Sequence, residues 1–363
     1  MIDSAEPHTY SVAALPGDGI GAEVLPVAID LLDQAAALED VSFRWEHHDW
    51  SCERWVETGS MVPDDALDTL AENDAIFLGA VGAPGVPDHI SLWGMLIPIR
   101  RRFGQFVNLR PVKLFPGVRG PVRDDLVEGM DLVVVRENNE GEYSEVGGRL
   151  YRGLPEEIAV QESIFTRVGV ERVMRYAFEL ARSRRGRLMS ATKSNGIVHT
   201  MPFWDQILEE LAPQYADVEV AQRHIDALAA TCVLDPCSLD VIVASNLFGD
   251  ILSDITAAVA GSIGIAASGN IDPTGEQPSM FEPVHGSAPD IAGQGVANPL
   301  GQIWSGVLML EHLGYPTAAG ALMTAIERML AETDVRTPDL GGSSTTRQVA
   351  DTVSRLLEEH AAS

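Results

Sequence analysis

Short runs of β-branched residues alternate with amphipathic segments along almost the whole sequence, and this alternation restricts the chain to few folds. Helices are expected at 22–37 and 63–73, and each later strand is followed by a helical segment. The pattern predicts an α/β protein with a largely parallel sheet. Because open parallel sheets bind ligands at the carboxyl ends of their strands, the residues after each strand are the first functional candidates. The expected strands are 10–15, 42–48, 74–81, 131–137, 187–192, 218–224 and 239–245.

Residues 143–165 interrupt this pattern. They contain two extended segments around a turn with glycine and proline, and no helical segment. Two interpretations are open, an arm that reaches a partner subunit and an antiparallel edge of the sheet, and the residues alone favour neither.

The charge balance argues against two classes of partner. The chain has 53 acidic and 25 basic residues and a formal net charge of −28. Such a surface repels nucleic acid and anionic lipid, so neither is an expected partner. Two explanations of the acidity remain open: adaptation to high internal salt, which screens repulsion between carboxylates, and the arginine-biased genome of an ordinary bacterium.

The length of 363 residues allows about two domains. No apolar stretch approaches the ~18 residues that a membrane span needs, and the N-terminus lacks the pattern of a signal peptide. Cys52, Cys232 and Cys237 are odd in number and have no metal-type spacing, so no disulfide scaffold is expected. These features predict a cytoplasmic protein.

Three aspartates form the clearest group of candidate metal ligands. Asp250 and Asp254 are four residues apart in a segment that is expected to be helical, so both carboxylates lie on one face. A cation between them would relieve their repulsion, and oxygen ligands suit Mg²⁺ or Mn²⁺ better than zinc. Asp226, in QRHIDAL, is the third candidate. The competing interpretation is a solvated acidic helix edge.

Arginine forks bind carboxylates in a bidentate manner, so converging arginines would suit a diacid. A single arginine is more often part of a surface ion pair. Four arginines fall close to expected strand or helix ends: Arg100, Arg110, Arg136 and Arg152.

Two further side chains are candidates for proton transfer. Lys193 is one of two lysines in a chain that otherwise uses arginine, and only lysine offers an amine that can deprotonate. Tyr143 follows ENNEGE, where it could act as a general acid or be an ordinary half-buried tyrosine.

Two glycine-containing turns are weaker signals of a cofactor. The turn GDGIG follows a strand, but it lacks the GxGxxG pattern of a dinucleotide site. The loop HGSAPDIAG contains Asp290, which could accept hydrogen bonds from ribose hydroxyls or simply cap a helix.

Taken together, these segments resemble the β-decarboxylating dehydrogenases, the family of isocitrate, 3-isopropylmalate, tartrate and D-malate dehydrogenases. The matching segments follow the family's order from residue 15 to about 305, which is nearly the whole chain. They are LPGDGIG, NLRPVKL, VVVRENNEGEYS, SATKSNG, HID, SNLFGDILSD, FEPVHGSAPDIAG and ANPLGQIWS.

The resemblance implies an α/β, isopropylmalate/isocitrate dehydrogenase-like fold of two domains with a continuous mixed sheet, and not a Rossmann fold. Residues 1–105 and 261–363 would form a large NAD-binding domain. Residues 106–260 would form a smaller domain with the dimer interface, and 143–165 would be the dimer arm. The active site would lie in the cleft between the domains.

The resemblance also implies the roles of the candidate residues. Arg100, Arg110 and Arg136 would bind the substrate, together with Asp226. Asp250, Asp254 and Asp226 of the partner subunit would hold Mg²⁺ or Mn²⁺, and K⁺ is a further candidate ion. Lys193 of the partner subunit would take the hydroxyl proton, and Tyr143 would protonate C3 after decarboxylation. Asp290 would favour NAD over NADP. The implied cofactor-binding residues are His285, Gly286, Ser287, Ala288, Asp290 and Asn298.

Within the family, 86–94 (VPDHISLWG) together with FEPVHGSAPD is most similar to tartrate and D-malate dehydrogenases. The stretch 91–99 would line the pocket for the substituent on C3, and Asn139 departs from the usual threonine beside the substrate loop. A 3-isopropylmalate dehydrogenase is the main alternative. A non-catalytic regulatory subunit of the family is disfavoured because the tyrosine, the lysine and the aspartates are all present. A metal-dependent hydrolase on an unrelated fold would not explain HGSAPDIAG.

Overall fold

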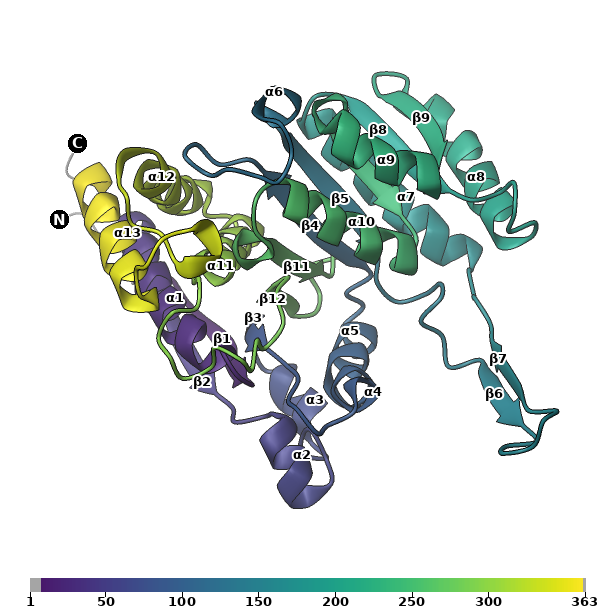
Figure 1. Ribbon diagram of the computed structural model, residues 1–363, viewed down its shortest axis with the longest axis horizontal. Coiled ribbons are helices and arrows are strands. Elements are labelled where there is room, and N and C mark those ends of the chain that lie inside the picture. Colours follow the sequence, from purple (N-terminus) through teal and green to yellow (C-terminus); the bar gives the residue numbers. More distant parts are fainter. Residues whose placement is uncertain (1–7, 362–363) are drawn as a thin grey trace. The chain divides into compact units, whose positions relative to one another are not determined.

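The computed structural model describes residues 8–361 (Figure 1). The described chain divides into two compact units. Unit 1 comprises 8–104, 114–121 and 260–361, and unit 2 comprises 105–113 and 122–259. The chain therefore passes between the units more than once.

Unit 1 has five strands in the order β2-β1-β3-β12-β11. β1 pairs in parallel with β2 and β3, β3 pairs in parallel with β12, and β11 is antiparallel to β12. The strands are β1 (His8–Gly17), β2 (Val41–His47), β3 (Ala75–Ala80), β11 (Ala267–Ile271) and β12 (Ser279–Pro283). The helices are α1 (Gly21–Ala36), α2 (Cys52–Thr58), α3 (Ala66–Leu70), α4 (Asp88–Ser91), α5 (Ile97–Arg102), α11 (Leu300–His312), α12 (Pro316–Glu332) and α13 (Thr346–Ala361). Short 3₁₀ turns occupy Ala37–Glu39, Ile263–Ile265 and Pro338–Leu340.

Unit 2 has seven strands, five of which are arranged side by side in the order β4-β5-β10-β8-β9, and among these five only β4 and β5 pair in antiparallel fashion. A separate antiparallel pair is formed by β6 and β7. The strands are β4 (Val107–Lys113), β5 (Asp131–Glu137), β6 (Gly147–Leu150), β7 (Ile158–Gln161), β8 (Arg187–Thr192), β9 (Glu219–His224) and β10 (Val241–Ala244). The helices are α6 (Asp124–Val127), α7 (Arg167–Ser183), α8 (Thr200–Leu211), α9 (Ile225–Leu234) and α10 (Asn246–Val259), with 3₁₀ turns at Ala212–Tyr215 and Pro236–Ser238.

The predicted α/β class is confirmed: apart from the β6-β7 pair, ten strands of mixed direction are present in residues 8–361, five in each unit. Every expected strand is present, with ends that differ by at most two residues. The expected helix 63–73 is shorter in the structure, where only Ala66–Leu70 is helical. Three strands were not predicted, namely β4, β11 and β12.

The segment 143–165 contains two strands, as expected, but they form a sheet of their own. The interpretation as an antiparallel edge of the main sheet is therefore wrong. All residues of β6 and β7 are exposed, and the hairpin projects from the rest of its unit (Figure 1). That it reaches a partner subunit stays a prediction.

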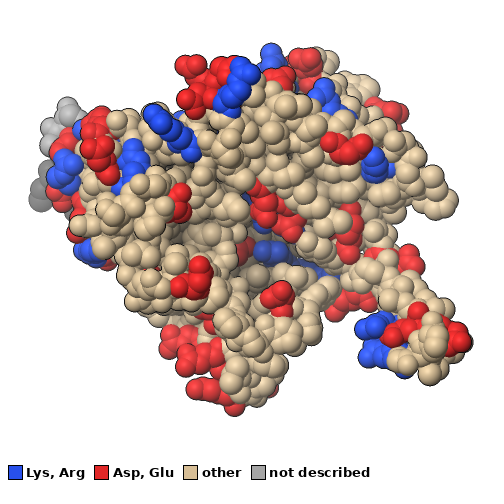
Figure 2. Space-filling view, in the orientation of Figure 1, with Lys and Arg blue, Asp and Glu red and all other residues tan. Residues whose placement is uncertain are grey.

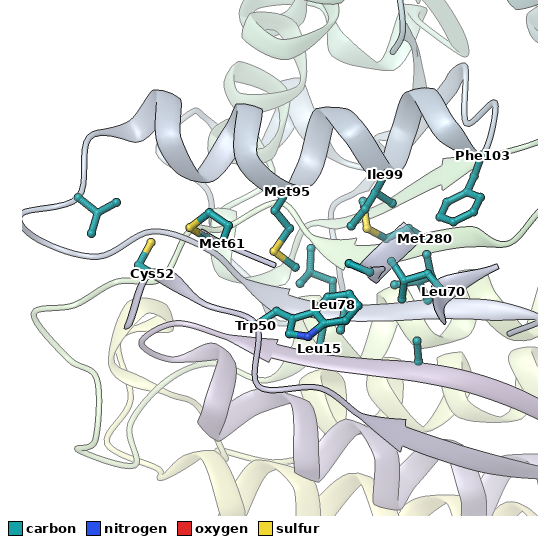
Figure 3. Close-up of a cluster of buried hydrophobic side chains, with 14 residues drawn as sticks. Leu15, Trp50, Cys52, Met61, Leu70, Leu78, Met95, Ile99, Phe103 and Met280 are labelled. Atoms are coloured by element: carbon teal, nitrogen blue, oxygen red, sulfur yellow. The ribbon is translucent and has the colours of Figure 1, made fainter. Parts of the chain in front are cut away.

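A core cluster in unit 1 fixes the helical segment that carries Arg100. Met95 and Ile99 are spaced one helical turn apart and point onto Leu78 and Met280 of the sheet (Figure 3). Between α4 and α5, residues Leu92–Leu96 form a π-helical turn in which the Ile97 N–H donates to the Leu92 carbonyl. Pro98 follows directly and has no N–H to offer to the preceding turn, so a local widening of the helix is expected here.

The surface agrees with the acidic composition. Acidic side chains are spread over both units on the face shown in Figure 2. No helix among residues 8–361 is long and apolar enough to cross a membrane. The three cysteines are free thiols, as the sequence predicts.

Candidate active site

The turn after β1 is held by a buried carboxylate. Both oxygens of Asp18 accept the N–H of Cys52, at 3.0 and 3.2 Å, and Oδ2 also accepts the N–H of Gly82 at 2.9 Å. Gly19 has a φ of 58°, and a Cβ there would lie 2.1 Å from the carbonyl oxygen of Ser287. Ile20 donates its N–H to that same oxygen at 2.9 Å. The turn GDGIG therefore needs glycine at position 19 and is joined to the loop at 285–298.

The six predicted cofactor-binding residues all lie in the connection between β12 and α11. Asn298 is buried, and its amide donates to Oδ2 of Asp339 at 2.9 Å while its oxygen accepts the Leu300 N–H at 3.0 Å. Asp290 is exposed. A cavity of about 290 Å³ lies beside this connection and the β1 turn, lined in part by Asp18, Gly19, Gly82, Pro289 and Ala292.

Arg100 is buried in unit 1, and one of its buried donors, Nε, is unpaired among the described residues. Its Nη2 donates to Oε1 of Glu282 at 2.9 Å, and Glu282 also accepts the side-chain amide of Asn270 at 2.7 Å. The Nε of Arg100 is buried and makes no hydrogen bond within the described part of the chain. The guanidinium therefore retains a donor for a further acceptor, such as a carboxylate.

In unit 2, two predicted arginines converge on one predicted aspartate. Arg136 is the penultimate residue of β5, Arg110 lies on β4, and the antiparallel register of these strands places them close together. Oδ1 of Asp250 accepts Nη1 of Arg136 at 2.5 Å and lies 3.3 Å from Nη1 of Arg110. Asp254, one turn further along α10, has an oxygen 3.8 Å from the same Arg110 nitrogen. The expected common face of the two aspartates is confirmed.

Four residues that the sequence analysis missed fix this group. Asn246 accepts Nε and Nη2 of Arg136 at 3.1 and 2.7 Å. Arg110 donates to the side chains of Asn108 and Ser253, both at 2.6 Å. A Cβ at Gly249 would lie 2.6 Å from the Cβ of Arg136, so glycine lets α10 approach β5. The glycine inside an expected helix was a usable signal of close packing.

Tyr143 joins the same group through Asp250. Its hydroxyl donates to Oδ2 of Asp250 at 2.8 Å, and the guanidinium of Arg136 lies 5.6 Å from its ring centre. Burial raises the pKa of Tyr143, and the negative charge of Asp250 raises it further. The phenol is therefore protonated at neutral pH.

Asp254 is more open to solvent than Asp250, with side-chain exposures of 58% and 32%. Desolvation raises the pKa of Asp254, the charge of Arg110 lowers it, and the charge of Asp250 raises it. A cation between the two carboxylates would remove this repulsion, and both oxygens come from one rigid helix. This donor set fits a hard divalent cation.

Lys193 and Asp226 form a separate pair in unit 2. Nζ of Lys193 lies 2.6 Å from Oδ1 of Asp226, and the hydrogen bond lowers the pKa of that carboxyl. Lys193 follows β8, and Asp226 lies in the first turn of α9. Within residues 8–361, no three acidic, histidine or cysteine side chains come together as a metal site. One chain therefore does not gather Asp226 with Asp250 and Asp254. Arg152 is exposed and lies in the connection between β6 and β7.

Glu137, directly after Arg136, is an ionisable group that the sequence analysis did not single out. Its Oε1 accepts the N–H of Asn139 at 2.8 Å and of Glu140 at 3.0 Å. Burial raises the pKa of Glu137 to about 7, although these two hydrogen bonds and Arg172 work in the opposite direction. The carboxyl thus fixes the turn that leads to Tyr143. Because it is buried, its charged form lowers the stability of the folded protein.

Comparison with known proteins supports the resemblance drawn from the motifs. The model of the isocitrate/isopropylmalate dehydrogenase family matches residues 11–353. The chain is 53% identical to a probable tartrate dehydrogenase/decarboxylase of Bacillus subtilis (strain 168), over 96% of this chain and 98% of that protein. It is 51% identical to the decarboxylating D-malate dehydrogenase of Escherichia coli (strain K12), over 96% and 99% respectively.

Solved structures confirm the predicted fold class. The isocitrate dehydrogenase of Methylococcus capsulatus is 33% identical with a TM-score of 0.84, over 96% of this chain and 99% of that chain. A β-decarboxylating dehydrogenase of Thermococcus kodakarensis is 34% identical with a TM-score of 0.78, over 96% of each chain.

Glu137 generates a prediction about pH. Its folded pKa lies above the usual value of 4.5, so between these two values the folded state holds a proton that the unfolded state releases. The group's contribution to stability therefore falls as the pH rises through this window. Glu137→Gln keeps the acceptor without the charge. Relative to the wild type, its free energy of unfolding should rise by roughly 2 kcal/mol between pH 5 and pH 8, at about 1.4 kcal/mol per pKa unit. Urea unfolding of both proteins at both pH values measures this change. If the variant and the wild type differ in free energy of unfolding by the same amount at pH 5 and pH 8, the raised pKa of Glu137 is contradicted.

Proposed function

Because the chain belongs to the isocitrate/isopropylmalate dehydrogenase family, and is therefore an oxidoreductase, we propose that it oxidises tartrate or D-malate with NAD and a divalent metal ion. Decarboxylation follows for suitable substrates. Members of the family generally depend on NAD(P) and a divalent metal. The observation that carries the proposal is the convergence of Arg110, Arg136 and Tyr143 on Asp250, a combination that can bind a carboxylate, a cation and a proton at one place.

The arginines are the proposed ligands of the substrate's carboxylates. Arg110 and Arg136 are buried and held by fixed partners, so their forks are preorganised for a carboxylate. Arg100, with its spare Nε, is the third proposed carboxylate ligand. A small 2-hydroxy diacid has two carboxylates to be bound in this way.

Asp250 and Asp254 are the proposed metal ligands of one subunit, completed by Asp226 of the partner subunit, which also contacts the substrate. The donor set is all oxygen and anionic, which suits Mg²⁺ or Mn²⁺. When bound at these residues, the metal would supply Lewis acidity at the substrate's C2 hydroxyl, and NAD would supply the hydride acceptor. K⁺ remains a further candidate ion with no ligand set assigned.

Two side chains of the protein move protons. The proposed base is Lys193 of the partner subunit, which takes the proton of the C2 hydroxyl, and its pairing with Asp226 holds the amine in place. The proposed acid is Tyr143, whose raised pKa keeps it protonated until C3 of the decarboxylated product needs a proton. Because Lys193 and Tyr143 are assigned to different chains, the active form is a homodimer. A reducing cytoplasm suits its free cysteines.

The connection from His285 to Asn298 is the proposed NAD site. Its backbone joins the glycine turn after β1 and borders the cavity described above, which offers space for part of a dinucleotide. The exposed carboxylate of Asp290 can accept hydrogen bonds from ribose hydroxyls and would repel a 2′-phosphate. We therefore expect this site to prefer NAD over NADP.

Substrate choice gives the first test. With Mn²⁺ and NAD, D-malate or a tartrate isomer should give a higher kcat/KM than 3-isopropylmalate, because the segment 86–94 and the two curated relatives named above both indicate small substituents on C3. NADH production measured side by side with each acid decides this. A preference of about tenfold or more for 3-isopropylmalate, equal to ~1.4 kcal/mol, would overturn the assignment.

The shared active site gives the second test. Lys193→Ala should be nearly inactive, and Tyr143→Phe should be impaired in the protonation step. When the two variants are unfolded and refolded together, about half of the dimers are mixed, and each mixed dimer has one site with both groups intact. Activity should recover to roughly one quarter of the wild type by this counting. Mass spectrometry verifies the mixed dimers. No recovery would place both residues in one chain.

A further inference from the structure

The segment from Glu137 to Tyr143 is fastened by three carboxylates, each of which binds a different element. Glu137 binds the N–H groups of its own turn. Glu140 accepts the N–H and the hydroxyl of Thr166, both at 2.7 Å, at the start of α7. Glu142 accepts the hydroxyl of Ser245 at 2.8 Å and the N–H of Leu247 at 3.0 Å, at the start of α10. The mechanism above uses none of these carboxylates.

The bond from Glu142 reaches the helix that carries the proposed metal ligands. α10 spans Asn246–Val259 and presents Asp250 and Asp254. Its first turn has N–H groups without partners in the helix, and a carboxylate there is favoured by the helix dipole. One oxygen of Glu142 accepts the N–H of Leu247 in this turn, and the other accepts the hydroxyl of Ser245, the residue before the helix.

Two further bonds join the same segment to the same helix. The side-chain amide of Asn246 donates to the carbonyl oxygen of Glu140 at 3.1 Å, and Tyr143 donates to Asp250 at 2.8 Å. Gly141, at a φ of 96°, allows this approach, because its Cβ would lie 3.3 Å from the Cβ of Asn246. The helix and the segment are therefore connected at three successive points.

We propose that Glu142 is a positioning residue that fixes α10 relative to Tyr143, and so holds Asp250 and Asp254 in register for the cation and the substrate. The proposal rests on the function proposed above. A helix rises 1.5 Å per residue, so slippage of the first turn by a single residue would separate Asp250 from Tyr143. Misplacement of about 1 Å is enough to lower a rate by ~100-fold.

Glu140 provides a matched control. It lies two residues away, carries the same charge and also makes two bonds at the start of a helix, but α7 carries none of the proposed site residues. If loss of either carboxylate only loosened the segment, substitution of Glu140 and of Glu142 would have similar effects. If Glu142 positions α10, only its substitution should impair Mn²⁺ binding and turnover.

The experiment compares Glu142→Ala, Glu142→Gln and Glu140→Ala in the full-length protein. Binding of Mn²⁺ alone is followed by electron paramagnetic resonance of the free ion, and kcat and KM are measured with D-malate. Glu142→Ala should weaken Mn²⁺ binding and lower kcat, each by roughly 10- to 100-fold, as for other residues that orient metal ligands. Glu142→Gln, which keeps an acceptor, should fall between Glu142→Ala and the wild type. Glu140→Ala should change both quantities by less than about twofold.

Hydrogen exchange separates this proposal from the proposed function. In Glu142→Ala, the amides of 247–250 should exchange faster while those at the start of α7 stay protected. Unchanged Mn²⁺ binding and kcat in Glu142→Ala, or equal losses in Glu140→Ala, would overturn the proposal. If Glu142→Ala does not fold, wild-type values for Glu142→Gln in all three measurements overturn it. A wild type without Mn²⁺ binding or turnover would refute the proposed function, and the exchange pattern would then decide the positioning role alone.

Discussion

The carboxylate of Asp250 is the interaction on which the unit 2 part of the site depends. It receives Arg136 and Tyr143 as hydrogen-bond donors, has Arg110 within 3.3 Å, and shares a helix face with Asp254. Asp250 is partly exposed, but Arg110 and Arg136 are buried, and buried charges are stable only when their bonds are well formed, because removal of charges from water is costly. The same negative charge also raises the pKa of Tyr143. One side chain thus connects the residues proposed for anion binding, cation binding and proton donation.

Small residues and helix caps make this convergence possible. Gly249 lets α10 pack against the stem of Arg136, and Gly141 lets the preceding segment approach Asn246. Glu142 then binds the free N–H of the first turn of α10. Backbone placement by such fixed contacts explains how the charged groups are oriented before any ligand binds, which is the condition for electrostatic catalysis.

Much of this arrangement could be predicted from the sequence, and the misses have physical reasons. The apolar run 131–137 predicted β5 to the residue. β4 contains Pro111, which weakens a strand pattern, and β11 (ASGNI) has polar residues whose partners exist only in the fold, such as Glu282 for Asn270. The spacing of Asp250 and Asp254 was informative because a helix relates them. Lys193 and Asp226 are far apart in sequence, so no spacing could predict their contact.

The central claim is that Asp250 and its neighbours hold a cation that the reaction requires. The most direct measurement is NADH production from D-malate after exhaustive treatment with EDTA, followed by titration with Mn²⁺, for the wild type and Asp250→Asn. Chelation should abolish activity, Mn²⁺ should restore the wild type in full, and Asp250→Asn should require much more Mn²⁺, because one anionic ligand is lost. Full activity after EDTA treatment, or equal Mn²⁺ requirements in the two proteins, would contradict a role for Asp250 in holding the cation.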